Sequence, residues 1–148
     1  MFRGQFDHAM DAKGRISLPS RFRDALARSG DSVLIVTPSL TDACLDVFPL
    51  KRWEAFEMRV AELPRFDENV IKLRRFYVSA AVECDVDTQG RVLVPQSLRE
   101  RGKLDKAVVW AGMVDKAELW SAALWNRAST PAPEDKAFLR AIATEMKL

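Results

Sequence analysis

Polar and apolar residues alternate with the period of a strand near the start of the chain. Residues 15–18 place Ile16 and Leu18 on one face and polar side chains on the other, as expected for a half-buried strand. Pro19 ends this strand and suits the first turn of a helix. The segment RFRDALARSG then predicts a helix that ends at Gly30, which can adopt the positive φ angle of a C-terminal cap.

Helical spacing of apolar residues dominates the middle and the end of the chain. It predicts one helix from Pro49 to Leu63, ended by Pro64, and a second helix over residues 68–81. We expect these two helices to form a hairpin. A short amphipathic helix is predicted after Pro133, and the pattern leaves open whether it docks on a neighbour or stays mobile.

The first strand and helix recur in the second half of the chain. The sequence DAKGRISLPSRFRD at Asp11–Asp24 aligns without a gap with DTQGRVLVPQSLRE at Asp87–Glu100, an offset of 76 residues. Five of the 14 positions are identical, and four more exchange like for like. Further along, Trp53 corresponds to Trp125 at an offset of 72, which predicts a four-residue deletion in a loop of the second copy.

The repeat predicts a mainly β fold with helices, of the α+β class, in which a helical hairpin joins two β-rich halves. The expected regions are a first repeat at residues 5–54, a helical linker at 55–81, a second repeat at 82–128, and a C-terminal tail with a helix at 129–148.

Charge is nearly balanced over the whole chain but not locally. The 148 residues carry 23 Lys and Arg against 21 Asp and Glu, a formal net charge of +2. This balance excludes a uniformly basic protein that coats nucleic acid without selection. The first thirty residues hold six basic and three acidic side chains, so any DNA-binding surface must be built locally.

The cysteines and the N-terminus indicate the compartment. Cys44 and Cys84 lie forty positions apart without a CxxC pair, so they are interpreted as buried thiols in a reducing compartment. The N-terminus lacks the apolar stretch of a signal peptide, and no apolar run is long enough to span a bilayer. We therefore expect a cytoplasmic protein with no membrane partner.

Two motifs and their surroundings resemble one family over nearly the whole chain. The motifs are D-x-K-G-R-x-x-L-P-x-x-F-R from Asp11 and D-x-x-G-R-[VI]-x-[VI]-P-x-x-L-R-E from Asp87. Together with the MFRG start, the VFPLKRWE segment, the helical linker and the ELW segment, they resemble the paired SpoVT/AbrB-like repeats of the MraZ family. The C-terminal tail lies outside the resemblance.

The resemblance implies a fold and a function. Two repeats of the swapped-hairpin type would form a barrel-like core, and protomers would assemble into a homo-oligomer, a closed ring. The family binds repeated sites in the double-stranded promoter DNA of its own operon, in the division and cell-wall gene cluster, and usually represses it. Its D-x-x-x-R signature carries DNA recognition, and here it matches Asp11 with Arg15 and Asp87 with Arg91.

The chemistry of these residues supports a DNA contact independently. The guanidinium of Arg15 or Arg91 can make a bidentate contact with guanine or phosphate, and the aspartate four residues earlier could hold it in place. Lys13, Arg21 and Arg23 add charges that suit phosphate groups. These side chains are therefore the candidate DNA-binding residues.

The same residues also have structural interpretations. The two aspartates could act only as turn residues that bind local backbone N–H groups, and the two arginines could be their buried ion-pair partners. The second copy has Gln89 in place of Lys13 and Ser97 in place of Arg21. It therefore carries less charge and could chiefly support the fold.

Other function classes fit the sequence less well. An enzyme is disfavoured, because the chain has no paired Cys and His, GxSxG elbow, phosphate-cradling loop or metal-ligand cluster. The alternative is an AbrB-like module that acts through a protein partner, antitoxin-like or scaffold, but such modules usually carry one repeat. The sequence thus predicts a nucleoid-associated, sequence-specific DNA-binding transcriptional regulator that uses no cofactor, metal or small-molecule substrate.

Overall fold

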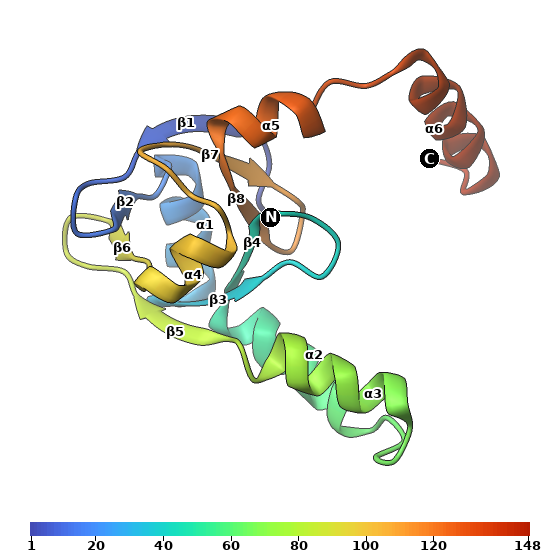
Figure 1. Ribbon diagram of the computed structural model, residues 1–148, viewed down its shortest axis with the longest axis horizontal. Coiled ribbons are helices and arrows are strands. Elements are labelled where there is room, and N and C mark those ends of the chain that lie inside the picture. Colours follow the sequence, from blue (N-terminus) through green and yellow to red (C-terminus); the bar gives the residue numbers. More distant parts are fainter.

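The computed structural model describes all 148 residues as an antiparallel sheet, a separate two-stranded ribbon and surrounding helices (Figure 1). The strands are β1 Gln5–Ala9, β2 Arg15–Ser17, β3 Val33–Pro38, β4 Leu45–Pro49, β5 Val82–Asp85, β6 Arg91–Leu93, β7 Ala107–Gly112 and β8 Ala117–Ser121. The helices are α1 Ser20–Ser29, α2 Leu50–Ala61, α3 Glu68–Leu73, the π-helix η1 Arg74–Val78, α4 Gln96–Arg101, α5 Ala122–Ala128 and α6 Pro133–Glu145.

The two copies of the repeat exchange strands. The six-stranded sheet has the order β1-β7-β8-β4-β3-β5, so the first strand of each copy pairs with a strand of the other copy. This exchange fits the expected repeats of the swapped-hairpin type, because neither copy completes its sheet alone. The α+β class is confirmed. The sheet does not close into a barrel, since β1 and β5 remain at its two edges.

An approximate twofold axis relates the copies. In the ribbon, Ile16 pairs with its own counterpart Val92, and in the sheet Asp46 pairs with its counterpart Glu118. Because each of these pairs joins a residue to its own counterpart, the axis passes through both pairs. The ribbon and the sheet are therefore stacked along one axis, which places the two β-turns before β2 and β6 symmetrically at one end of the molecule (Figure 1).

The four-residue deletion in the second copy is split between two places. Strands β2 and β6 begin 76 residues apart, β3 and β7 begin 74 apart, and β4 and β8 begin 72 apart. Helix α4 has 6 residues against 10 in α1, but the loop after it is two residues longer, so two residues are lost in this region and two more in the loop after β7. The prediction of a single deletion in one loop is thus wrong, because helix α4 also ends about one turn earlier than α1.

The main core lies between one face of the sheet, the ribbon and helices α1 and α4. Its cluster of 17 buried residues contains Ile16 and Val92 from the ribbon and Phe22 from α1. Phe22 contacts Phe2 and Trp110 edge to face, at ring distances of 5.0 and 6.2 Å. Each such side chain stabilises the fold by about 1.5–3 kcal/mol through burial.

The helical hairpin packs on the opposite face of the sheet. The predicted second helix is α-helical only to Leu73 and then widens into the π-helix η1. There the carbonyl of Tyr77 accepts a hydrogen bond from Thr37 Oγ1 at 2.8 Å, and the Tyr77 hydroxyl donates to Asp46 Oδ2 at 2.6 Å. These two bonds to buried strand residues compensate for the irregular helix geometry, a constraint that periodicity alone does not reveal.

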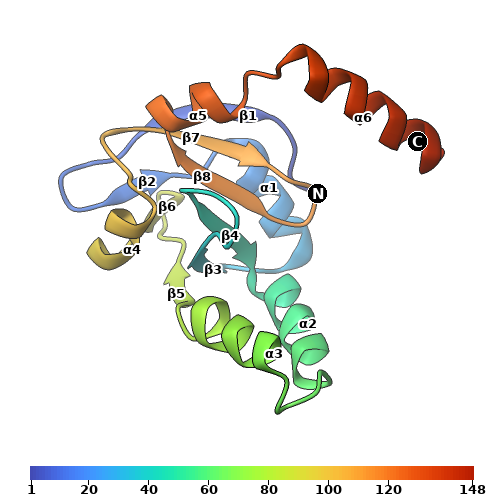
Figure 2. The same cartoon turned by 45° about the vertical axis from the view of Figure 1, so that its right-hand side comes forward.

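The C-terminal helix α6 extends away from the body of the molecule (Figure 2). It has no buried residue, and its apolar side chains Phe138 and Leu139 are 65% and 59% exposed. The predicted helix after the proline segment is thus confirmed. None of the helices combines the length and apolar character that crossing a bilayer would demand.

Candidate nucleic-acid interface

The turn that precedes β2 is built around one carboxylate. Oδ1 of Asp11 accepts hydrogen bonds from the backbone N–H groups of Lys13 and Arg15, each at 2.9 Å. Oδ2 accepts from Nε of Arg15 at 2.6 Å. The N–H of Gly14 donates to the Asp11 carbonyl at 3.0 Å, and Gly14 adopts a φ of +91°. We call residues 11–15 turn 1.

The turn that precedes β6, residues 87–91, repeats this arrangement and is called turn 2. Asp87 Oδ1 accepts from the N–H groups of Gln89 and Arg91 at 2.9 Å, and Oδ2 accepts from Arg91 Nε at 2.9 Å. Gly90 has a φ of +74°. Each aspartate therefore acts as a turn residue and also holds its arginine. One carboxylate oxygen accepts from the backbone N–H groups, and the other accepts from the guanidinium.

The carboxyl groups of both turns titrate low. The two backbone N–H donors and the Arg15 guanidinium stabilise the charged form and lower the pKa of Asp11 to about 2, with the hydrogen bond from the Arg15 N–H as the largest cause. The equivalent hydrogen bond from the Arg91 N–H lowers the pKa of Asp87. Both turns are thus ion-paired at neutral pH.

The ribbon presents one polar face to solvent. Ile16 and Val92 are buried, so alternation turns Arg15, Arg91 and Leu93 outward on the other face. The side chains of Arg15 and Arg91 are 34% and 28% exposed, which corrects the interpretation of a buried ion pair. Only Nε of each arginine is bonded within the chain, so the terminal nitrogens remain available as donors.

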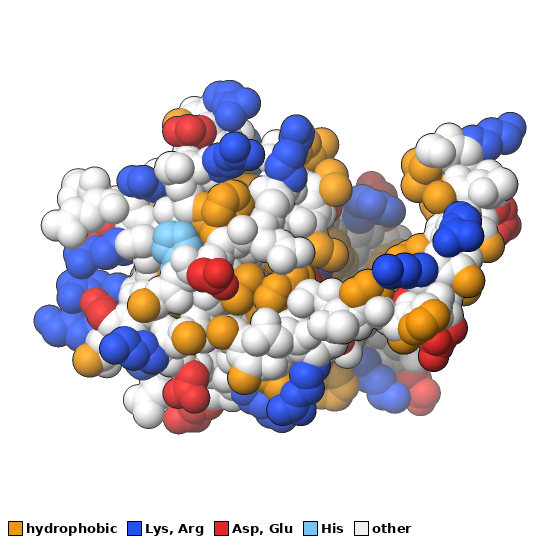
Figure 3. Space-filling model, turned by 90° about the horizontal axis from the view of Figure 1, so that it is seen from above, with side chains coloured by type: hydrophobic (Ala, Val, Ile, Leu, Met, Phe, Trp, Pro, Cys, Tyr) orange, Lys and Arg blue, Asp and Glu red, His pale blue; other side chains and the backbone are white.

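Each turn is bonded to the other copy as well as to its own strand. The carbonyl of Gly14 accepts from Val94 N at 3.0 Å, and the carbonyl of Gly90 accepts from Leu18 N at 2.9 Å. Each turn is therefore anchored by the residue after the partner strand. Lys and Arg side chains gather at this end of the molecule, at the left of Figure 3, with acidic side chains between them.

The remaining predicted residues divide between this surface and another. Lys13 is exposed in turn 1, and Arg23 extends from α1 to Gly90 of turn 2. Arg21 lies elsewhere, because it lines a hollow together with Arg3 and Arg28 beside the N-terminus. The structure thus brings together six of the seven predicted side chains and separates Arg21 from them.

Sequence reasoning missed two residues at this surface. Leu93 is 54% exposed on the same face of the ribbon as the two arginines, paired with Arg15 across the strands, and alternation in β6 could have placed it there. Arg99 of α4 lies against Gly14, and its identity with Arg23 in the aligned repeats was the available signal. Both belong to the second copy.

A group of possible metal ligands lies on the twofold axis, inside the sheet. Ligand atoms of Cys44, Asp46 and Glu118 are within 4.8 Å of one another. However, Lys116 Nζ lies 2.8 Å from Asp46 Oδ1, and Trp120 Nε1 donates to Glu118 Oε1 at 3.1 Å. With the Tyr77 hydroxyl, these donors occupy three of the four carboxylate oxygens, so the group is a buried polar network. Burial raises the pKa of Cys44 to about 12, so its thiol is protonated and a poor ligand.

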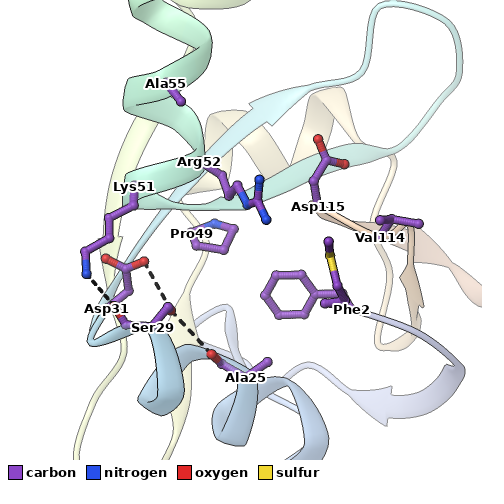
Figure 4. Close-up of a pocket in the computed structure, with 11 residues that line it drawn as sticks. Phe2, Ala25, Ser29, Asp31, Pro49, Lys51, Arg52, Ala55, Val114 and Asp115 are labelled. Atoms are coloured by element: carbon purple, nitrogen blue, oxygen red, sulfur yellow. Dashed lines mark hydrogen bonds between the residues drawn. The ribbon is translucent and has the colours of Figure 1, made fainter.

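A separate cavity of about 360 Å³ lies between α1, α2 and the loop after β7 (Figure 4). Phe2, Pro49 and Val114 provide apolar walls, and Arg52 and Asp115 lie at its rim. None of its lining residues belongs to turn 1 or turn 2. The cavity therefore takes no part in the candidate interface.

Comparison with known proteins identifies close relatives. A family model described as "MraZ protein, putative antitoxin-like" matches residues 1–75 and 77–144. The transcriptional regulator MraZ of Carboxydothermus hydrogenoformans is 45% identical over 126 residues, which cover 85% of each chain. The protein of the same name from Pseudomonas aeruginosa is 43% identical, over 85% of this chain and 83% of its own. That of Pediococcus pentosaceus is 41% identical, over 85% of each chain.

Proposed function

The chain belongs to the MraZ family, and we propose that it is a DNA-binding transcriptional regulator that contacts promoter DNA through the β2–β6 ribbon and its two turns. Its relatives are named transcriptional regulators, and the similarity covers most of their length. The observation that carries the proposed site is the paired arrangement of Arg15 and Arg91, each aligned by an aspartate on the exposed face of the ribbon.

A two-stranded ribbon has dimensions that fit the major groove of B-DNA. Bonding of Arg15 Nε to Asp11 fixes the plane of the guanidinium and leaves its terminal nitrogens for the acceptors O6 and N7 of guanine. A good bidentate contact of this kind discriminates between bases by about 1–3 kcal/mol. Leu93, exposed beside Arg15 on the same face of the ribbon, provides an apolar contact for a thymine methyl group.

The charges around the ribbon suit the DNA backbone. Lys13 is exposed at turn 1 and carries a point charge for a phosphate group, and Arg23 adds a second charge beside turn 2. Turn 2 has the neutral Gln89 in place of Lys13. We therefore assign the stronger DNA contact to turn 1 and a weaker one to turn 2.

One ribbon contacts only a few base pairs, so selective binding requires several ribbons. A homo-oligomer in a closed ring would present many ribbons to repeated sites, and the effective concentration of each after the first contact raises the avidity. The proposed target is the promoter of the protein's own operon in the division and cell-wall gene cluster, with repression as the outcome and the nucleoid as the location. The protein acts by binding, without catalysis or a cofactor. An antitoxin-like or scaffold role is not favoured by the relatives' names.

A gel-shift titration on the DNA upstream of the gene tests the proposal. The full-length protein should retard this DNA selectively in the presence of scrambled DNA of equal length. Arg15→Ala should weaken binding at least tenfold, whereas Arg28→Ala, an exposed position at the end of α1, should not. Unchanged selective binding by a folded Arg15→Ala protein would contradict the assigned role of Arg15. Equal affinity of the wild-type protein for scrambled DNA would contradict the function itself.

A further inference from the structure

The glycine of each turn is in contact with an arginine from the other copy. A Cβ atom built on Gly14 would lie 2.8 Å from both Cζ and Nε of Arg99, so the guanidinium rests directly on the backbone of turn 1. A Cβ on Gly90 would lie 2.4 Å from Cδ and 2.6 Å from Nη1 of Arg23. Arg23 and Arg99 are equivalent positions of α1 and α4, so the two contacts cross between the copies.

Arg99 has no bonded partner that would explain its placement. Its Nε is buried and donates no hydrogen bond within the chain, and no ion pair includes Arg99. A buried guanidinium N–H without a partner is unfavourable, so packing must hold it there. The packed surface is turn 1 itself, since Gly14 and the Val94 carbonyl enclose the same space.

The Arg23 contact is at least as close, but it lies in a more open region. Arg23 is exposed, and it lines a cavity of about 270 Å³ between α1 and turn 2 that also reaches Asp87, Thr88 and Gly90. Turn 2 therefore has room to move on the side where Arg23 lies. Turn 1 is enclosed more tightly by Arg99.

We infer that Arg99 is a positioning residue for Arg15, and that Arg23 is the weaker equivalent for Arg91, so that each DNA-contacting turn is held by the helix of the other copy. Arg15 follows Gly14 directly and bonds to Asp11 within the same turn. A shift of turn 1 thus moves the Arg15 guanidinium that contacts DNA. A small misplacement of this side chain weakens its contact with the base strongly. This inference rests on the proposed DNA-binding function.

Double-mutant cycles in the full-length protein test whether each arginine positions the turn of the other copy. Arg99→Ala should weaken binding to the upstream DNA by roughly three- to thirtyfold, and this loss should disappear in an Arg15→Ala background but persist in an Arg91→Ala background. Arg23→Ala should cause a smaller loss that disappears only in the Arg91→Ala background, in addition to the loss of the phosphate contact of Arg23 itself, which persists in both backgrounds. Arg101→Ala, an exposed position on the same helix as Arg99, is the matched control and should bind like wild type.

A second measurement distinguishes positioning from a direct phosphate contact. Arg99→Ala should leave the slope of log affinity against log salt unchanged, because no counterion-releasing contact is lost. Loss of a phosphate contact would instead reduce the slope by about 0.9 per contact, and Arg99→Lys would restore it. That result, or equal losses in the Arg15→Ala and Arg91→Ala backgrounds, would overturn the inference.

Hydrogen exchange tests the same contact without DNA. The N–H groups of Lys13, Gly14 and Arg15 are all hydrogen-bonded or enclosed within turn 1. In Arg99→Ala, exchange in a peptide covering residues 11–15 should accelerate severalfold, while exchange in residues 87–91 stays at the wild-type rate. Equal acceleration in both turns would mean general loosening of the fold and would overturn the inference. If the turn responds but the wild-type protein binds no DNA selectively, the proposed function fails and the contact stands.

Discussion

Turn 1 and turn 2 share a backbone but not their surroundings. Each has an aspartate that accepts two backbone hydrogen bonds, a glycine with positive φ and an arginine bound through Nε. Turn 1 adds Lys13 and is enclosed by Arg99, whereas turn 2 has Gln89 and borders a cavity beside Arg23. The features that close the turn are therefore duplicated, while charge and packing differ between the copies.

This difference separates what the fold requires from what recognition requires. Asp and Gly recur in both turns, because the aspartate accepts from the backbone N–H groups and the glycine adopts the left-handed conformation at no steric cost. Charge beside the turn is not needed for folding, so one copy can lose it. We expect variants that affect the shared backbone to change stability, and variants of the flanking charge to change DNA affinity.

The largest expected effect is the loss of stability when a side chain is added to the glycine of turn 1. In Gly14→Ala the new Cβ would meet the Val94 carbonyl oxygen at 2.9 Å as well as Arg99, at a φ of +91°. In Gly90→Ala the nearest atoms all belong to the flexible Arg23 side chain. We expect unfolding free energies lower by about 3 kcal/mol for Gly14→Ala and about 1 kcal/mol for Gly90→Ala, measured by denaturant unfolding.

Removal of the contacting arginine provides the control. Arg23→Ala in the Gly90→Ala background should recover part of the lost stability, because the atoms nearest to the new methyl group all belong to Arg23. Arg99→Ala should not rescue Gly14→Ala, since the carbonyl of Val94 remains in place. Equal losses for both glycine variants, with equal rescue, would show that the two turns are packed alike.

Local chemistry explains which parts of the site could be predicted from the sequence. The turn, the strand and the helix after it depend on neighbouring residues: Asp11 caps the turn, Gly14 supplies the positive φ, and Pro19 lies directly before α1. Such features are set within a few residues and recur in the second copy. Gly30 likewise ends α1 in the left-handed conformation, as its position predicted.

Long-range pairing explains what could not be predicted. Alternation in β1 shows which residues point inward, but it does not tell that β1 pairs with β7 of the other copy. Asp46 and Glu118 look like surface positions of their strands, yet they are 2% and 8% exposed. The partners of Asp46 are Tyr77 and Lys116, which lie far away in sequence, so only the fold brings them to it. The contact between Arg99 and Gly14 has the same origin.

A smaller effect is expected when the charge of turn 1 is copied to turn 2. Gln89→Lys places an ammonium group at the position equivalent to Lys13, so the slope of log affinity against log salt should steepen by about 0.9 for each new phosphate contact. Affinity at low salt should rise a few-fold, measured by fluorescence anisotropy over a salt series. Ser97→Arg is the matched control, because its counterpart Arg21 lies with Arg3 and Arg28, away from the turns. A steeper slope for Ser97→Arg alone would contradict this assignment.

The smallest expected effect is on the acid stability of the turns. The pKa of Asp11 is lowered to about 2, below the value of about 3.9 in an unfolded chain, so its contribution to stability is complete above about pH 4 and is lost as the pH falls toward 2. Asp11→Asn removes this titration, while the amide oxygen can still accept from the N–H groups of Lys13 and Arg15. The unfolding free energy of Asp11→Asn should therefore depend less on pH between 4 and 2 than that of the wild type, measured by urea unfolding at several pH values. Asp87→Asn should likewise reduce the loss of stability below pH 4, because the equivalent hydrogen bond from Arg91 lowers the pKa of Asp87. If both variants lose stability in parallel with the wild type, neither carboxylate is held by its turn, and the turns are closed by their glycines and strand pairing alone.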